Sequence, residues 1–264
     1  MDEIDRSEHP TTSKQRVAVV TGGASGIGAA TARQLGAQQM RIVIADIDRD
    51  AAERTAAELS SAGLDAAAIL IDVASAHSVD AAFAEVEQRH GRCDVLVNCA
   101  GVAKTYPFLE FPLDNWQRTM EINVTGAMLC AQRAARLMVP RRWGRIINIA
   151  SVAGLRAVGT GRTAYGTSKA ALVALTRQIA VELAADGITA NAICPGPVDT
   201  PLTRVLHSDQ FRSEYTRAIP MSRYGTTEEI AFAAAFLASD GASYITGIAL
   251  PVDGGFLAAG ARPD

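Results

Sequence analysis

The chain has 264 residues, of which 48% are apolar and 20% charged, and its formal net charge is −3. This length and apolar content suffice for one sizeable core and exclude a disordered chain. No stretch is strongly basic, so nucleic-acid binding has no electrostatic support, and no apolar run reaches about 18 residues, so no membrane span is expected.

The first residues and the cysteines indicate where the protein works. Residues 1–14 are polar, lack the apolar segment of a signal peptide and predict a mobile tail. The cysteines form no C-x-x-C pair, and they are Cys93, Cys99, Cys130 and Cys194. Reduced, partly buried thiols of this kind are typical of a cytosolic protein. The four histidines show no metal-ligand spacing, so no metal site is predicted.

From residue 15 onward, short β-branched runs alternate with alanine-rich amphipathic stretches. Strands are predicted at 16–21, 41–45, 67–71, 94–98, 145–150, 188–194 and 245–252. Helices are predicted at 26–38, 49–62, 75–90, 114–139, 164–186 and 226–239. The strands are apolar along their length, as a parallel sheet covered on both faces requires. We therefore expect residues 15–264 to form a single α/β domain, a doubly wound (Rossmann) parallel sheet of about seven strands with helices on both faces.

The first predicted strand runs into a glycine-rich turn, and a helix follows it. The spacing is G-x-x-x-G-x-G, with the glycines at Gly22, Gly26 and Gly28. Such glycines let the backbone approach a pyrophosphate and aim the helix N-terminus at its charge. A turn that serves only packing is the alternative. The strand–turn–helix context near the start of an alternating chain favours dinucleotide binding.

An acidic residue follows the second predicted strand. Asp46 lies about 20 residues after the last glycine, where a carboxylate can bind both ribose hydroxyls of adenosine and repel a 2′-phosphate. The alternative is a cap for the next helix. Asp48 can serve as that cap, which leaves Asp46 for the ribose, so the sequence predicts NAD rather than NADP as the cofactor.

A tyrosine and a lysine share one face of the predicted helix at 164–186. Tyr165 and Lys169 are four residues apart, which places them one turn from each other. A phenol is a poor base near neutral pH, but a nearby ammonium favours its phenolate, as acid/base chemistry on an alcohol or ketone requires. Ser151 follows a buried strand at its carboxyl end, where ligands of open α/β sheets bind. Separately, each of these residues also fits an ordinary structural role.

One long segment, 196–225, lacks strand character and predicts a substrate lid. Its residues 201–224, together with residues 152–163, would roof the substrate pocket. Its apolar candidates are Leu155, Val158, Leu202, Leu206, Phe211 and Tyr215. Its polar candidates are Arg156, Arg162, Arg204, His207 and Arg212.

Along roughly 15–256 the chain resembles the short-chain dehydrogenase/reductase family. The motifs that carry the resemblance are Thr-Gly-x-x-x-Gly-x-Gly, Asn-x-Ala-Gly at 98–101, the helical Asn123, Ser151, Tyr-x-x-x-Lys at 165–169 and Pro195-Gly196. Cys99 departs from the family's commoner second asparagine and brings a thiol near the cofactor.

The resemblance implies a set of site residues. Ser151, Tyr165 and Lys169 would be catalytic, with Asn123 holding a water that links Lys169 to solvent. The implied cofactor-binding residues are Gly22, Ser25, Gly26, Ile27, Gly28, Asp46, Ile47, Asp72, Val73, Asn98, Ala100, Gly101, Tyr165, Lys169, Pro195, Gly196, Val198 and Thr200. The resemblance also implies a homotetramer of dihedral symmetry.

These residues predict an oxidoreductase that transfers a hydride between NAD(H) and a secondary alcohol or ketone of the polyol, sugar or cyclic alcohol class. Tyr165 is its expected acid/base. The alternatives are an epimerase or dehydratase on the same scaffold, a 3-oxoacyl thioester reductase, and a non-catalytic NAD-binding sensor. A sensor has no need of the pair formed by Tyr165 and Lys169.

Overall fold

The computed structural model describes residues 15–260, so the tail predicted for residues 1–14 lies outside the described residues. Its centre is a seven-stranded sheet in the order β3-β2-β1-β4-β5-β6-β7, and every pairing is parallel. The strands are β1 (Val17–Thr21), β2 (Arg41–Asp46), β3 (Ala66–Leu70), β4 (Val95–Asn98), β5 (Gly144–Ile149), β6 (Ile188–Pro195) and β7 (Ala249–Val252). The predicted doubly wound Rossmann sheet is confirmed.

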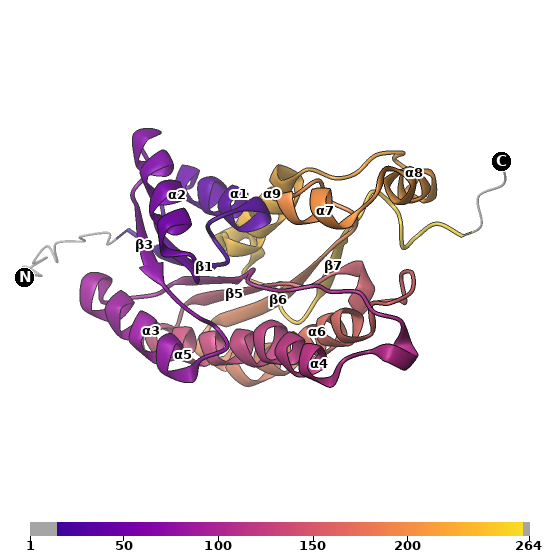
Figure 1. The fold of residues 1–264 in the computed structure, drawn as a ribbon. Helices are drawn as coiled ribbons and strands as arrows, with labels where there is room; N and C mark the ends of the chain where they lie inside the picture. The colour runs from indigo at the N-terminus through magenta and orange to yellow at the C-terminus, as the bar shows by residue number, and fades with distance from the viewer. Residues whose placement is uncertain (1–14, 261–264) are drawn as a thin grey trace, which may run out of the picture.

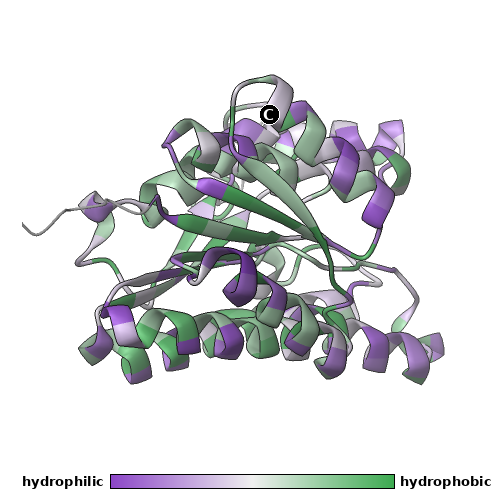
Figure 2. Cartoon of the chain, turned by 90° about the vertical axis from the view of Figure 1, so that its left-hand side faces the viewer, coloured by the Kyte–Doolittle hydropathy of each residue, from purple (hydrophilic) through white to green (hydrophobic). Residues whose placement is uncertain are grey.

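Helices cover both faces of the sheet (Figure 1). On one face lie α1 (Gly26–Ala37), α2 (Arg49–Ser61) and α9 (Thr227–Ala238). On the other lie α3 (Ala76–His90), α4 (Leu113–Met120), α5 (Ala127–Met138) and α6 (Thr163–Leu183). Figure 2 shows the strands mostly apolar between helices whose outer turns are hydrophilic.

The alternation of side chains along each strand fills two separate cores. Ala18, Val20, Ile42 and Ile44 pack with α1, α2 and α9. Their chain neighbours Val17, Val19, Val43 and Ala45 pack with α3, α5 and α6. All eight side chains are buried, which explains why the strands are apolar at every position rather than at alternate ones.

Three predicted elements differ from the structure. The single helix predicted at 114–139 is divided into α4, a π-helical turn at Glu121–Gly126, and α5. The segment predicted at 196–225 as a lid without strand character contains two helices, α7 (Pro201–Leu206) and α8 (Asp209–Ala218). Both begin with a side-chain cap, Thr200 accepting from Thr203 N and Ser208 from Phe211 N, which fixes their first turns.

The last strand is shorter than the predicted 245–252. Gly247 has a φ of 77°, a left-handed conformation that ends extended backbone, and its N–H donates to the Ala190 carbonyl. The strand therefore begins only at Ala249. No helix within residues 15–260 is long and apolar enough to cross a membrane.

Candidate active site

A cleft of about 1790 Å³ opens at the carboxyl ends of the strands. It lies at the point where the strand order reverses: β2 and β3 are added on one side of β1, and β4 to β7 on the other. In doubly wound sheets, ligands bind at this switch point. Its lining combines predicted residues from seven segments of the chain, namely Gly22, Ser25, Gly26, Ile27, Asp46, Ile47, Asp72, Val73, Ala100, Gly101, Ser151, Tyr165, Lys169, Pro195, Gly196, Val198 and Thr200.

Three predicted residues lie behind this wall rather than on it: Gly28, Asn98 and Asn123. A Cβ on Gly28 would lie 2.1 Å from the Gly22 carbonyl oxygen, so this glycine is needed for close packing of α1 on the turn. The Asn98 amide donates to Asn148 Oδ1 at 2.9 Å and to the Ala127 carbonyl at 3.2 Å. Gly28 and Asn98 therefore support the residues of the cleft wall through close packing and hydrogen bonds.

The glycine turn lies tightly against the loop that follows β4. Gly22 has a φ of 64°, and a Cβ there would lie 2.8 Å from the Ala100 backbone. The Thr21 hydroxyl accepts from Cys99 N at 3.2 Å and from Ala100 N at 3.4 Å, which ties the ends of β1 and β4 together. These contacts position two backbone segments along the same side of the cleft.

Asp46 sits at the rim of the cleft with a fixed orientation. Its carboxylate accepts from Ala24 N at 3.1 Å and from Asp48 N at 3.2 Å. Asp48 caps α2 by accepting from Ala51 N at 3.0 Å, as expected. A carboxylate has about four lone-pair sites, so the two backbone donors leave Asp46 able to accept from a ligand.

Ser151 is buried where β5 ends, and within residues 15–260 its hydroxyl has one polar contact. Its Oγ accepts from Ala153 N at 3.1 Å and so caps a short 3₁₀ turn, Val152–Gly154. A hydroxyl that accepts one bond can still donate its own proton. Ser151 therefore presents a donor to any oxygen bound in the cleft.

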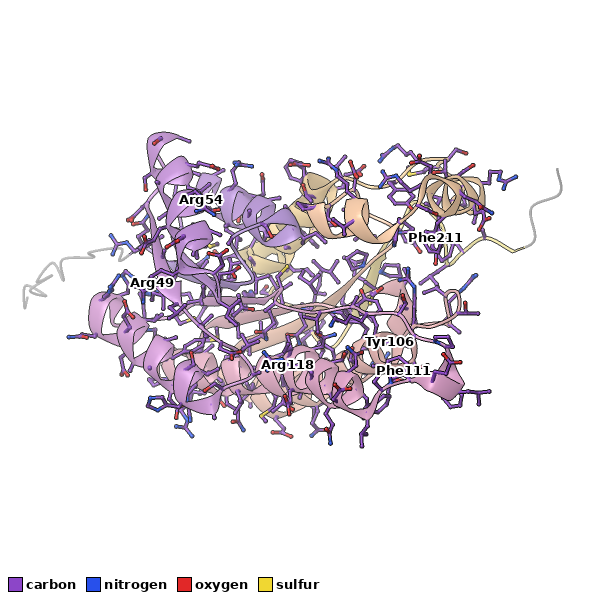
Figure 3. The ribbon with its side chains drawn as sticks, viewed as in Figure 1. Arg49, Arg54, Tyr106, Phe111, Arg118 and Phe211 are labelled. Atoms are coloured by element: carbon purple, nitrogen blue, oxygen red, sulfur yellow. The ribbon has the colours of Figure 1, made fainter. Side chains whose placement is uncertain are left out.

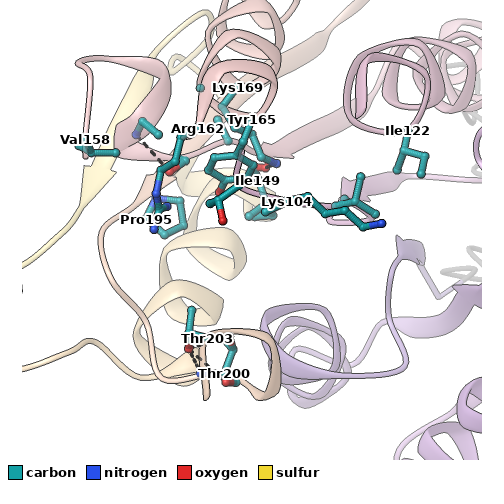
Figure 4. A pocket seen from close by; sticks show the side chains of 18 of the residues that line it. Lys104, Ile122, Ile149, Val158, Arg162, Tyr165, Lys169, Pro195, Thr200 and Thr203 are labelled. Carbon is teal, nitrogen blue, oxygen red and sulfur yellow. Dashed lines mark hydrogen bonds between the residues drawn. The ribbon is translucent and has the colours of Figure 1, made fainter. Parts of the chain in front are cut away.

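Lys169 and Tyr165 lie one turn apart on α6, as the spacing predicts. Lys169 is 5% exposed, and its Nζ donates to the Ile149 carbonyl at 2.8 Å. The same ammonium lies 5.7 Å from the centre of the Tyr165 ring. Figure 4 shows both residues on the α6 side of the cleft, with Thr200 and Thr203 on the opposite side.

Asn123 lies in the π-helical turn that interrupts the predicted helix. Its Oδ1 accepts from Val102 N at 2.8 Å, and its Nδ2 donates to the Val102 carbonyl at 3.0 Å and to Ser168 Oγ at 2.9 Å. The amide thus ties the loop after β4 to α6. Single π turns often occur at functional sites.

The substrate end of the cleft lies between the lid and the loop that follows β4. Figure 3 shows Phe211 on the α8 side and Tyr106 on the side of α4 and α6. Of the candidates for this end, Val158, Arg162, His207, Phe211 and Tyr215 line the cleft. Leu155, Arg156, Arg204 and Arg212 do not, and the side chains of Leu202 and Leu206 lie outside what the structure describes.

Similarity to known proteins identifies the family of this chain. A family profile described as "Enoyl-(Acyl carrier protein) reductase" matches residues 22–257. The chain belongs to the short-chain dehydrogenase/reductase family.

Three relatives illustrate the range of this family. The chain is 43% identical to cis-4-hydroxycyclohexanecarboxylate dehydrogenase of Sinomonas cyclohexanicum, over 92% of this chain and 97% of that enzyme. It is 36% identical to a 3-oxoacyl-[acyl-carrier-protein] reductase of Aquifex aeolicus, over 91% and 96%. A gluconate 5-dehydrogenase from Burkholderia cenocepacia, solved with NADP and tartrate, superposes with a TM-score of 0.89 at 35% identity, over 93% and 96%.

Short-chain dehydrogenase/reductases bind a nicotinamide dinucleotide, and the residues here fit one. The N-terminus of α1 reaches the cleft with no side-chain cap, which leaves backbone N–H groups for a pyrophosphate. At Gly26 the nearest atoms to an added Cβ lie 3.8 Å away, on Pro201 and Thr200 across the turn. Asp46 and Asp72 line the cleft where β2 and β3 end.

A thiol lies near this cofactor site, and its burial disfavours the thiolate form. Cys99 lines the cleft, and burial raises the pKa of its thiol to about 11. Burial likewise raises the pKa of Cys194 to about 11. All four cysteines are free, and protonated thiols of this kind are poor nucleophiles.

Sequence reasoning missed one wall of this enzyme's cleft. The loop after β4 contributes Val102, Ala103, Lys104, Thr105, Tyr106, Pro107 and Phe108, and the next elements contribute Asn115, Arg118 and Ile122. The available signal was position: this loop leaves the carboxyl end of a central strand, as Ser151 does. The loop has no motif of its own. It reaches the site because β4 pairs in parallel with β5, so the loops that follow the two strands leave the same edge of the sheet.

Proposed function

We propose that the protein transfers a hydride between NAD(H) and a secondary alcohol or ketone of the cyclic alcohol, polyol or sugar class. The observation that carries this proposal is the group of three side chains at the cleft, the Ser151 hydroxyl, the Tyr165 phenol and the Lys169 ammonium. A bound nicotinamide would supply or accept the hydride. The remaining work, which is to hold the substrate oxygen and move its proton, falls to these three residues.

In this proposal Tyr165 donates a proton to the ketone oxygen or takes it from the alcohol. The Ser151 hydroxyl donates to the same oxygen while its lone pair accepts from Ala153 N. The Lys169 ammonium is fixed by the Ile149 carbonyl and favours the phenolate electrostatically. Asn123 would link Lys169 to solvent through a water. Since its side-chain amide is bonded to Val102 and Ser168, we propose that its backbone holds this water.

The preference for NAD is proposed from charge. Asp46 would face the adenosine ribose, and a 2′-phosphate would bring roughly −1.5 to −2 charges against it. Two nearby cations are engaged elsewhere: Arg49 lies 3.8 Å from Glu53, and Arg41 lies 2.7 Å from Asp65. Because one structural relative is solved with NADP, this preference needs direct measurement.

The relatives support the substrate class and leave a second candidate. Two of them are named as dehydrogenases, one of a hydroxylated ring acid and one of gluconate, a polyol acid. Both names fit a secondary alcohol as the group that would meet Tyr165. Another is named for 3-oxoacyl thioester reduction, so this reaction is the second candidate. The free cysteines support a reducing compartment, and we propose the cytosol.

The test is to mix purified protein with NAD⁺ or NADP⁺ and a panel of cyclic alcohols, polyols and 3-hydroxyacyl thioesters. We expect reduced cofactor to accumulate, measured by its absorbance, with NAD⁺ and at least one cyclic alcohol or polyol. Turnover of thioesters alone would favour the second candidate. Cofactor binding without turnover of any of these would favour a sensor, and isomerised product without net reduction would favour an epimerase.

A further inference from the structure

A positively charged side chain reaches the substrate end of the cleft without an acidic partner. Arg162 lines the cleft, is half-buried and immediately precedes Thr163, where α6 begins. Its Nη2 lies 3.3 Å from Nε2 of His207. No carboxylate lies within ion-pair distance of its guanidinium among the residues that the structure describes. A partly desolvated charge of this kind is costly unless a ligand compensates it.

Other arginines around this end have a carboxylate partner. Arg204 and Arg212 share Asp199, at 2.9 and 3.2 Å, and the Arg204 hydrogen bond in particular lowers the pKa of that carboxyl. Arg118, on α4, lies 3.8 Å from Glu121. Arg162 therefore differs from these arginines because no carboxylate partner is found for it among the described residues.

The charges that line the cleft are also unevenly distributed. The acidic residues in its wall are Asp46 and Asp72, which follow β2 and β3 at the cofactor end. The substrate end contributes Arg162 and no acidic side chain, and the other cations of the cleft wall are Lys104, Arg118 and Lys169. A negative group on the substrate would meet a favourable field there.

The partner of Arg162 orients it without neutralising it. A guanidinium only donates, so His207 Nε2 must be the accepting nitrogen, and Nδ1 then donates to the Tyr224 hydroxyl at 3.1 Å. Burial and the nearby Arg162 and Arg212 lower the pKa of His207 to about 4, which keeps the ring neutral near pH 7. The ring also packs on Phe211, with centroids 4.5 Å apart.

We propose that Arg162 binds a carboxylate of the substrate while Tyr165, three residues further along the chain, holds the reacting oxygen. His207 is then the positioning residue for Arg162. The substrates are hydroxy acids and keto acids whose carboxylate is separated from the reacting carbon. This inference rests on the proposed function, because it assigns the substrate of that same site. A carboxylate is the simplest match, since a planar guanidinium pairs with it through two hydrogen bonds.

The binding test uses a matched pair of probes that cannot react, cyclohexanecarboxylate and its neutral methyl ester, each added with NAD⁺. We expect thermal unfolding of the wild type to shift upward with the acid and much less with the ester. Arg162→Met should lose the shift given by the acid. Arg156→Met is the control, because Arg156 lies over the Phe256 ring, outside the cleft lining, and this variant should keep that shift.

The kinetic test uses 4-hydroxycyclohexanecarboxylate and its methyl ester. Arg162→Met should raise KM for the acid by about 10- to 100-fold, the loss expected for a charge-assisted pair, and leave kcat for the ester nearly unchanged. His207→Phe should raise KM for the acid with a smaller effect on kcat. Arg162→Lys, which keeps the charge and loses the paired geometry, should fall between. It also replaces Arg162→Met if that variant does not fold.

Two outcomes would overturn the proposal: equal shifts for acid and ester in the wild type, or equal losses in the Arg162 and Arg156 variants. An acid-specific shift without turnover of these two compounds or of any alcohol in the panel described above would refute the proposed function and leave the carboxylate site standing. Failure of the two ideas is therefore distinguishable.

Discussion

The hydroxyl of Tyr165 has no hydrogen-bond partner among the residues that the structure describes, although it lines the cleft. A phenol held in this way is available to a substrate oxygen. Tyr165→Phe keeps the ring and removes the proton, so turnover should fall by roughly 10²- to 10⁴-fold while the cofactor still binds. Steady-state kinetics and cofactor titration by fluorescence measure the two effects.

The control for this substitution is Tyr244→Phe, which removes the hydroxyl of a tyrosine outside the cleft lining. It should leave kcat unchanged. Turnover near the wild-type value in Tyr165→Phe would remove this residue from the acid/base role.

Asp46 carries the second prediction at this scale. Its two backbone donors hold the carboxylate in place, and Asp46→Ala removes the charge that a 2′-phosphate would meet. The wild type should have a clearly higher kcat/KM with NAD⁺ than with NADP⁺. The variant should reduce the ratio of these two values, because kcat/KM should fall with NAD⁺ and rise with NADP⁺.

Asp50→Ala is the matched control, because Asp50 is an exposed acid in the first turn of α2. It changes the same net charge and should leave the cofactor ratio in place. A wild type that prefers NADP⁺, or an unchanged ratio in Asp46→Ala, would show that Asp46 does not set the preference.

How far the site could be predicted depends on what kind of signal each residue carries. Tyr165, Lys169 and the glycines have fixed spacings, so the sequence alone places them together. Arg162 and Tyr106 have no such spacing. Tyr106 N donates to the Gly161 carbonyl at 3.1 Å, a contact between loops more than fifty residues apart that the sequence pattern does not encode.

Helices and strands, like single residues, divide into those with a clear sequence signal and those determined by tertiary contacts. Strands with continuous apolar runs and helices with clear caps match the predictions closely, as in α2 and α3, whose caps are Asp48 and Ser75. The π-helical turn at Glu121–Gly126 was missed because apolar residues continue on both sides of it. What defines it is a tertiary contact, the bonding of Asn123 to Val102, and not local propensity.

The lid helices carry the third prediction. α8 has no buried residue and has ten residues in all, a length at which an isolated helix is marginal in water. Tyr215 on this helix stacks on Phe256, with centroids 5.7 Å apart. We expect α7 and α8 to be the least protected internal helices in hydrogen exchange of the enzyme without ligands.

The same helices should gain protection when cofactor and substrate are added together. The reason is that the start of α7, at Thr200 and Pro201, lies beside Gly26 of the glycine loop, where the cofactor would bind. The internal reference is β5, whose residues are all buried. Amides of α8 that exchange as slowly as those of β5 without ligand would contradict this prediction.

At the scale of the whole molecule, apolar side chains remain exposed around the open edge of the sheet. β7 is the last strand of the sheet and pairs on one side only, with β6. Around it, on α9 and the turn before β7, lie Phe232, Phe236, Tyr244 and Ile248, of which Phe232 is 59% exposed. An edge strand and apolar patch of this kind are a liability unless another chain covers them.

We therefore predict a homotetramer of dihedral symmetry, in which β7 and α9 meet a second copy and the helices α4, α5 and α6 form the other interface. On this second side Leu113 and Val181 are exposed apolar residues, 69% and 78%. Light scattering at micromolar concentration should give about four times the chain mass of 27.7 kDa.

Phe232→Glu should place a charge in the first interface and yield a smaller assembly, because an unpaired buried charge is strongly unfavourable. Glu58→Gln, on the exposed side of α2, should leave the mass unchanged. A wild-type protein that sediments at 27.7 kDa would refute the assembly, and a tetramer in Phe232→Glu would move the interface away from α9.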